Sequence, residues 1–273
     1  MNHAKTRAAL AAIALLASAC GTATSAGIDE AEDAASAPAS AAVGEAGDAS
    51  TDAASAVLAA GWADHVTITI NADTFTFASD GLPSHEVLDQ YLADGPGGKY
   101  IAGGVSATST TIQIPLVATM AATPANTGLG AIGVAVSGAV FFNPYEGDGT
   151  STVANDDNSS IDGIPFLDAC GGHPLPNASA YHYHGIPFCI TDALDTEGQH
   201  SEVIGYLLDG FAIYGPQGVD GTEPTDLDAC MGHTGTVPGA TGESYHYHVS
   251  VQANYISACL SGSFTASGPG GPA

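Results

Sequence analysis

The sequence predicts a mostly β domain whose strands form either a β-sandwich-like or a barrel-like arrangement. Apolar and polar residues alternate over short stretches, and no long stretch has the 3.6-residue period of an amphipathic helix. Four sequence landmarks also recur in the same order, which indicates an internal duplication. We expect disulfide bonds to cross-link this domain, and we expect a disordered acidic tether to precede it.

The first 19 residues have the features of a secretory signal peptide. Lys5 and Arg7 precede an apolar run over residues 8–17, and small residues lead to Cys20. This site is similar to a bacterial lipobox, so Cys20 is expected to be lipidated and to become the mature N-terminus. We therefore expect an exported protein held by its lipid at a membrane, at the periplasmic face or cell surface of the outer membrane.

Composition divides the rest of the chain into three parts. Residues 20–60, the lipidated cysteine and the segment after it, are almost all Ala, Ser, Gly, Thr, Asp and Glu, which predicts a flexible acidic tether. The folded domain is expected over residues 61–266. Residues 267–273 form a Gly/Pro tail.

The charge balance limits the partners. Removal of the signal peptide leaves 29 acidic side chains and one cation, Lys99, a formal net charge of −28. No cationic surface exists to neutralise phosphates, so nucleic acid is excluded as a partner. The surface suits a salty medium, and calcium is a candidate ion for its acidic loops. Residues 156–163 have alternating oxygen ligands but lack the terminal Glu of a calcium loop, so a polar loop is expected there.

The domain begins with short strands. Residues 66–70 and 74–77 alternate as strands do, and the polar segment 71–73 between them predicts a turn. Residues 84–92 have a capping Ser and an apolar face, which predicts a short helix. Residues 110–117 are a further expected strand.

The duplicated units span about residues 132–189 and 204–259. Residues 132–144 align without gaps on residues 204–216. Each segment has an apolar run, an x-Gly pair and a second apolar run, which predicts a β-hairpin. Two such units usually pack about a pseudo-two-fold axis.

Two further motifs follow each hairpin. The sequence Leu-Asp-Ala-Cys-x-Gly-His occurs at residues 167–173 and again at 227–233. The tetrad Tyr-His-Tyr-His occurs at residues 181–184 and again at 245–248. A cysteine then closes each unit.

Four cysteines remain after Cys20, and an exported chain is expected to pair them. Three connectivities exist. The duplication favours one bond within each unit, Cys170–Cys189 and Cys230–Cys259. The alternative exchanges the partners between the units.

Six histidines occupy equivalent positions in the two units: His173, His182, His184, His233, His246 and His248. Residues two apart in a strand share a face, so each His-x-His pair points to one side, and a third imidazole could come from the Cys-x-Gly-His turn. Imidazole-only ligation predicts a transition metal, copper before zinc. The alternative is a buried polar network without metal.

Other candidate residues are less defined. Asp209 stands where the first unit has Ser137, and it is either a functional acid or the turn residue of an Asp-Gly hairpin. The tetrad residues Tyr183 and Tyr247 are the remaining weak candidates for catalysis. Three histidines lie outside any motif and are expected at the surface: His65, His85 and His200.

The two tetrads, the Asp-Gly-Phe-Ala-Ile-Tyr-Gly-Pro stretch at residues 209–216 and the paired Cys-x-Gly-His segments resemble the YHYH domain family. The resemblance covers roughly residues 100–260. It implies a secreted or surface protein with an important His/Tyr site, and it names no reaction. The first hairpin of the family often has Asn-Gly where this chain has Ser137-Gly138.

Two classes of function agree with these features. In the first, the lipoprotein binds a transition metal, either as a binding protein or as a metal-dependent oxidoreductase whose open coordination position and tyrosines take part. In the second, the protein is a non-catalytic structural or adhesive surface module, and the histidines form a buried polar network. The sequence identifies no substrate.

The Cys20→Ser variant should be released from the membrane fraction, because it cannot receive the lipid that is expected at that thiol. Fractionation of expressing cells, together with incorporation of labelled fatty acid, measures this effect. Wild-type protein that takes up no label would contradict the prediction.

Overall fold

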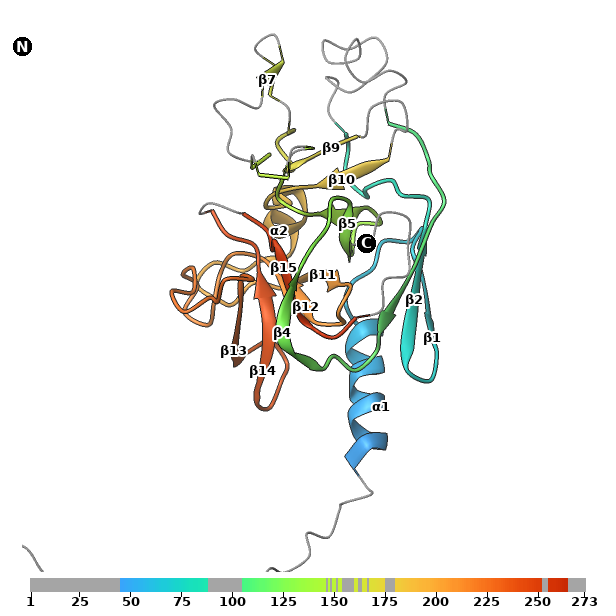
Figure 1. Cartoon of the computed structure of the whole chain (residues 1–273), viewed down its shortest axis with the longest axis vertical. Coiled ribbons are helices and arrows are strands. Elements are labelled where there is room, and N and C mark those ends of the chain that lie inside the picture. The colour runs from blue at the N-terminus through green and yellow to red at the C-terminus, as the bar shows by residue number, and fades with distance from the viewer. Residues whose placement is uncertain are drawn as a thin grey trace, which may run out of the picture. The chain divides into compact units, whose positions relative to one another are not determined.

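The computed structural model describes residues 45–87, 105–145, 147, 149–150, 152–153, 160–161, 164–165, 167–174, 180–251 and 255–264. Within these ranges strands predominate (Figure 1). The signal peptide and the Gly/Pro tail expected at the two ends lie outside them.

A small antiparallel sheet contains β1 (Thr67–Ile70), β2 (Thr74–Ser79) and β3 (Thr110–Pro115), in that order. These strands confirm the three strands predicted between residues 66 and 117. The short helix predicted over residues 84–92 is not formed in its described part. Residues 84 and 85 form a bend, residues 86 and 87 have no regular structure, and the remainder lies outside the described residues.

The largest sheet contains the two repeated units. Its strands are β5 (Ala131–Ala135), β6 (Val140–Phe142), β9 (Gly172–Pro174), β10 (Tyr181–Tyr183), β11 (Val203–Leu207), β12 (Ala212–Tyr214), β13 (Gly232–Thr236) and β14 (Glu243–His248). Their order is β13-β14-β12-β11-β5-β6-β10-β9. The predicted hairpins are β5–β6 and β11–β12. The sheet is open, with β13 and β9 at its ends, so the described strands are sandwich-like and not barrel-like.

The two units meet about a pseudo-two-fold axis, as predicted. Strand β5 pairs with β11 antiparallel, and Val134 lies opposite Tyr206, its own equivalent at an offset of 72 residues. On one side of this pair Gly133 lies opposite Leu207, and on the other side Ala135 lies opposite Gly205. The two pairs are equivalent when the units are exchanged. The two tetrad strands therefore lie near opposite ends of the sheet (Figure 1).

The core joins the small sheet to the middle of the large one. The Tyr206 ring stacks on Trp62 with centroids 6.0 Å apart and meets the edge of Phe75 at 5.4 Å. Trp62 also packs on Phe77 at 5.7 Å. Both phenylalanines are fully buried, because alternate residues of β2 face the large sheet.

Five further elements and two disulfides belong to the described part of the fold. The elements are β4 (Met120–Asn126), β15 (Cys259–Gly262), the strand pair β7 (Ser160–Ile161) and β8 (Ile164–Pro165), and helix α2 (Phe188–Leu194). Strand β15 pairs with β4. The disulfides are Cys170–Cys189 and Cys230–Cys259, which confirms the pairing within each unit.

Part of the expected tether is ordered. Helix α1 (Glu45–Leu58) lies within residues 20–60, and Val57 in its last turn and Ala60 just after it belong to the buried core. The Trp62 indole also donates a hydrogen bond of 2.6 Å to the Val57 carbonyl oxygen. The prediction of a flexible tether up to residue 60 is therefore wrong from residue 45 onward, because a few small apolar side chains suffice to dock the helix end.

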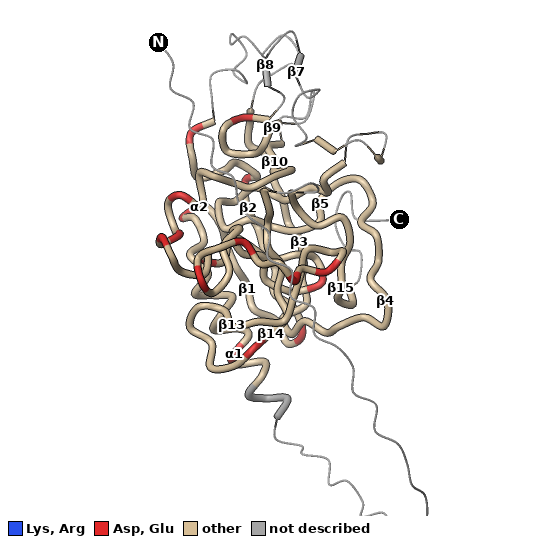
Figure 2. The backbone as a smooth tube through the Cα atoms, turned by 90° about the vertical axis from the view of Figure 1, so that its left-hand side faces the viewer, with Lys and Arg blue, Asp and Glu red and all other residues tan. Residues whose placement is uncertain are grey.

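The described residues contain no Lys or Arg, and Asp and Glu lie at many loops along the backbone (Figure 2). No helix in the described ranges is both long and apolar enough to cross a membrane.

Replacing Val57 with Ala should lower the free energy of unfolding by about 2 kcal/mol, because it removes two buried methyl groups and leaves a cavity. The matched control is Leu58→Ala, since Leu58 is the next residue and 58% exposed, and it should change stability by less than about 0.5 kcal/mol. Urea unfolding measures both. Equal effects would show that α1 is not docked.

Candidate metal centres

Each tetrad lies on a strand between two neighbours from its own unit. Strand β10 runs parallel to β6 and antiparallel to β9, and β14 has the same relation to β12 and β13. The register places His182 opposite His173 and His246 opposite His233. The third histidine of each unit therefore reaches its tetrad by strand pairing, as the sequence predicts.

The first histidine cluster contains His173, His182 and His184. All three side chains are buried, with ring centroids 4.4 to 5.1 Å apart. One nitrogen from each ring lies within 4.8 Å of the other two, close enough for a single metal ion. The Phe142 ring packs against His182 at 3.9 Å.

The second histidine cluster contains four rings. The Nε2 atom of His246 lies 3.1 Å from that of His248 and 3.1 Å from that of His233. It also lies 3.3 Å from the Nε2 atom of His200. Tyr214 packs against this cluster at the position that Phe142 has in the first unit.

His200 corrects an expectation. The sequence places it at the surface, but it is only 8% exposed and lies in the second cluster. The duplication could not reveal it, because the equivalent residue in the first unit is Gly128. The one feature of the sequence that could have indicated its role is its position just before β11, the first strand of the second hairpin.

A hydrogen bond to Nδ1 orients each ring. The acceptor in the first cluster is the carbonyl oxygen of Pro174 for His173 (3.0 Å), of Ala180 for His182 (3.1 Å) and of Asn143 for His184 (2.6 Å). In the second cluster it is the carbonyl oxygen of Ser201 for His200 (2.7 Å), of Ser244 for His246 (2.9 Å) and of Gly215 for His248 (2.6 Å), and the Asp226 carboxylate for His233 (2.9 Å). Because these oxygens only accept, Nδ1 carries a proton, and in each neutral ring Nε2 keeps a lone pair.

Close Nε2 atoms that all carry lone pairs cannot hydrogen-bond to one another. In the second cluster the Nε2 atoms nevertheless lie 3.1 to 3.3 Å from that of His246. Nitrogens bound to one tetrahedral ion at a metal–nitrogen distance of about 2.05 Å are about 3.3 Å apart. The three distances from His246 are therefore short enough for ligands of one cation. The group whose nitrogens all lie within 4.8 Å of one another contains His200, His246 and His248, and His233 is outside it. The Nδ1 bonds are of the kind that orients ligand histidines in metal sites.

Burial keeps the rings neutral. It lowers the pKa of His173 to about 3 and that of His184 to about 4, and the neighbouring His184 imidazole adds to the effect at His173. Burial likewise lowers the pKa of His246 to about 4 and that of His248 to about 3. The pKa of His182 is also well below its ordinary value, chiefly through burial. Neutral imidazole is the form that binds metals.

The first tyrosine of each tetrad points away from the histidines and is held by an aspartate. Tyr181 donates to both oxygens of Asp168 (2.9 and 2.8 Å), and Tyr245 donates to Asp228 (2.8 Å). Each aspartate also accepts bonds from backbone N–H groups two and four residues later. The Leu-Asp-Ala-Cys segments therefore fix the tetrad strands from the face opposite the histidines.

The three candidate catalytic groups lie on the same opposite face. Tyr247 donates a 2.5 Å hydrogen bond to Asp209, the fully buried residue of the Asp-Gly turn. Tyr183 lies 2.9 Å from the Ser137 hydroxyl and 2.7 Å from the Nε2 atom of His85. Burial raises the pKa of Asp209, Tyr183 and Tyr247. Asp209 and Ser137 thus occupy equivalent positions, and each contacts the second tyrosine of its tetrad.

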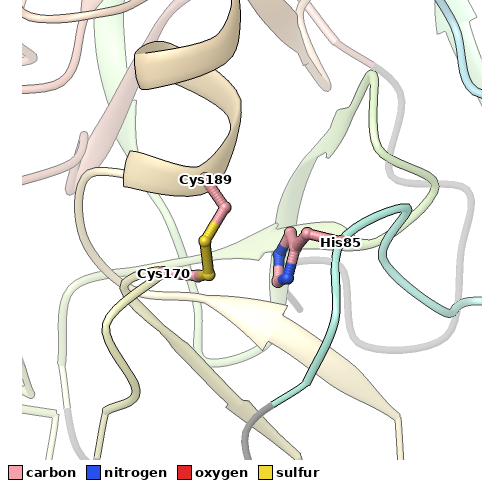
Figure 3. Close-up of side chains that lie close together, drawn as sticks. All are labelled: His85, Cys170 and Cys189. Atoms are coloured by element: carbon pink, nitrogen blue, oxygen red, sulfur yellow. A yellow bond between two sulfur atoms is a disulfide. The ribbon is translucent and has the colours of Figure 1, made fainter.

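The two other histidines in the described part of the chain, His65 and His85, do not join a histidine cluster. His85 lies beside the Cys170–Cys189 disulfide (Figure 3), whose oxidised sulfurs offer no thiolate to a metal. His65 lies 3.0 Å from the Leu82 carbonyl oxygen, with its side chain 31% exposed. The acidic loop at residues 156–163 is mostly outside the described residues.

The site defines a class of protein: a duplicated, disulfide-bonded β domain with buried histidine clusters. Residues 111–225 match the family model described as YHYH protein. This segment includes both hairpins and the first tetrad, and it ends before the second tetrad, which the duplication relates to the first. A search of curated proteins and a search of solved structures each gave no match.

The metal-free protein should lose stability as the pH falls below about 6.5. The unfolded chain protonates its histidines there, whereas buried His248 and its neighbours stay neutral to about pH 3–4. The unfolded state thus binds more protons in this window, and urea midpoints measured from pH 7 to about 4.5 should fall. Asp168 and Asp209 act in the opposite direction at the acid end, because burial raises their pKa. In the His248→Asn variant the urea midpoint should fall less between pH 7 and about 4.5. An equal decrease in the variant and the wild-type protein would contradict the prediction.

Proposed function

We propose that this protein is an exported, lipid-anchored metal-binding protein that holds two transition-metal ions, one in each histidine cluster. One observation carries this proposal. Three Nε2 atoms of the second cluster lie 3.1 to 3.3 Å from that of His246, while every Nδ1 atom of this cluster donates to an oxygen. A polar network without metal would instead join the rings to one another as donors and acceptors.

Copper is the preferred ion and zinc is second. Imidazole nitrogens suit both ions, whereas calcium and magnesium take oxygen ligands. The chain after Cys20 has two methionines, Met120 and Met231, so the thioether chemistry of a Cu(I) carrier does not contribute. Met120 lies on β4 and is 51% exposed.

Storage or transfer of the metal accounts for the site better than oxidoreductase chemistry at the tyrosines. The hydroxyl groups of Tyr183 and Tyr247 lie across the strand from the histidine nitrogens and bond to Ser137 and Asp209. Export is supported by the two disulfides, which persist in oxidising compartments. Anchoring at the outer membrane rests on the sequence around Cys20.

Purified protein should bind about two copper or zinc ions per chain, since each cluster supplies at least three neutral imidazoles. The double variant His182→Ala/His184→Ala should bind about one ion, and His246→Ala/His248→Ala should also bind about one. The control His65→Ala should keep both ions, because His65 belongs to neither cluster. Elemental analysis after dialysis measures the stoichiometry.

If the wild-type protein folds and takes up neither copper nor zinc at micromolar concentration, the histidines are architectural. The structural or adhesive surface module would then be the correct function. Loss of both ions in either double variant would contradict two separate sites.

A further inference from the structure

The two disulfides differ in their exposure to solvent. Cys189 lies in the first turn of α2 and is exposed, while its partner Cys170 is buried. Both residues of the second disulfide are buried, with exposed fractions of 2% for Cys230 and 9% for Cys259. Because disulfide exchange requires access to a sulfur, a thiol can approach the first disulfide at Cys189, whereas the fold protects the second.

A cleft leads to the exposed end of the first disulfide. It has a volume of about 490 Å³, and Cys189 itself forms part of its wall. Ser84, the residue before His85, and Ser137 of the first hairpin turn also line it. The cleft is large enough to admit a small dithiol.

An imidazole lies beside the same disulfide. One ring nitrogen of His85 and the Sγ atoms of Cys170 and Cys189 all lie within 4.8 Å of one another (Figure 3). In the described part of the chain, Cys230 and Cys259 form no such group with a third ligand. The equivalent disulfides of the two units therefore differ both in exposure and in the metal ligand beside them.

His85 is not the only partner of the tyrosine that it contacts. The Tyr183 hydroxyl lies 2.7 Å from the Nε2 atom of His85 and 2.9 Å from the Ser137 hydroxyl. The equivalent Tyr247 donates to the Asp209 carboxylate. Because Ser137 can hold the Tyr183 hydroxyl as Asp209 holds that of Tyr247, the His85 imidazole is able to turn to a metal ion.

We propose that the Cys170–Cys189 disulfide is reducible in the folded protein, and that its two thiolates and the His85 imidazole then form a third metal site for a thiophilic ion such as Zn(II) or Cu(I). Thiolate sulfur is the ligand that these ions prefer, and water takes the remaining position of a tetrahedral ion. Two sulfurs at about 2.3 Å from such an ion are about 3.8 Å apart, so reduction needs to separate them by less than about 2 Å. This site is separate from the histidine clusters and does not depend on their metal content.

The reduction takes two electrons and two protons, which a dithiol supplies. One thiolate of the dithiol attacks the sulfur of exposed Cys189, and the S–S bond breaks with Cys170 leaving as a thiolate. The second thiolate of the dithiol then attacks the first, which closes a cyclic disulfide and releases Cys189 as a thiolate. The two protons of the dithiol pass to the cysteines, and metal binding displaces them.

Selective alkylation tests the redox step. All samples carry Cys20→Ser, so that no other thiol is present. The folded protein is treated with limiting dithiothreitol and alkylated, and the modified cysteines are mapped by mass spectrometry. We expect modification of Cys170 and Cys189, with Cys230 and Cys259 still bonded. Reduction of the second disulfide first, or of both together, would overturn the proposal.

Cobalt tests the metal site. Reduced protein is freed of dithiothreitol without oxygen and titrated with Co(II), and the sulfur-to-cobalt charge-transfer absorption is followed. We expect this absorption from about one Co(II) per chain in the reduced protein, and none in the oxidised protein or in Cys170→Ser/Cys189→Ser. Reduced protein without the absorption would overturn the proposal. The histidine clusters contain no sulfur ligand, so failure of the proposed function leaves this result unchanged.

Replacement of the imidazole tests the third ligand. His85→Gln should bind this Co(II) at least about tenfold more weakly, because its amide can hydrogen-bond to Tyr183 but is a poor metal ligand. The matched control is His65→Gln, since His65 lines the cleft outside the ligand group, and it should keep the wild-type affinity. His85→Ala tests the same loss if His85→Gln does not fold. Wild-type Co(II) affinity in a folded His85 variant would overturn the three-ligand site.

Discussion

The hydrogen bond donated by each histidine Nδ1 is the interaction on which both clusters depend. Six of the seven acceptors are backbone carbonyls, and the seventh is the Asp226 carboxylate. The bond fixes the tautomer and the ring direction, and it leaves Nε2 as the basic atom. Because the fold itself supplies the carbonyls, most of the ligand geometry does not depend on the identity of neighbouring side chains.

Successive side chains of a β-strand point to opposite faces, so the histidines and tyrosines of each tetrad have different roles. The histidines of each tetrad face the metal centre, and the tyrosines fasten the strand from the other side. The fastening differs between the units: Asp209 accepts from Tyr247, whereas Ser137 and His85 contact Tyr183. A carboxylate in a fully buried position is costly unless it is hydrogen-bonded, and Asp209 also accepts from the backbone N–H of Gly262 (2.8 Å).

The sequence predicted the features that occur in both units or that depend on short stretches of residues. The hairpins follow from apolar runs around an x-Gly pair, and the disulfides and six histidines follow from the duplication. His200 could not be predicted in this way, since its counterpart is a glycine and its role arises only when strand pairing brings residues 200 and 246 together. The docking of α1 was missed because Val57 and Ala60 are too few to produce a recognisable apolar face. Their burial depends on Trp62 and on the sheet they pack against.

The register between β5 and β11 has a consequence for a single unit. Val134 faces its own equivalent there, so the outer edge of β5 is complementary to a second copy of itself. One unit alone would expose that edge as an unpaired row of N–H and C=O groups, and two copies could restore the sheet as a symmetric homodimer. Joining the copies in one polypeptide makes this association intramolecular and independent of concentration. It also frees the two halves to diverge, so that a ligand gained by one half need not appear in the other.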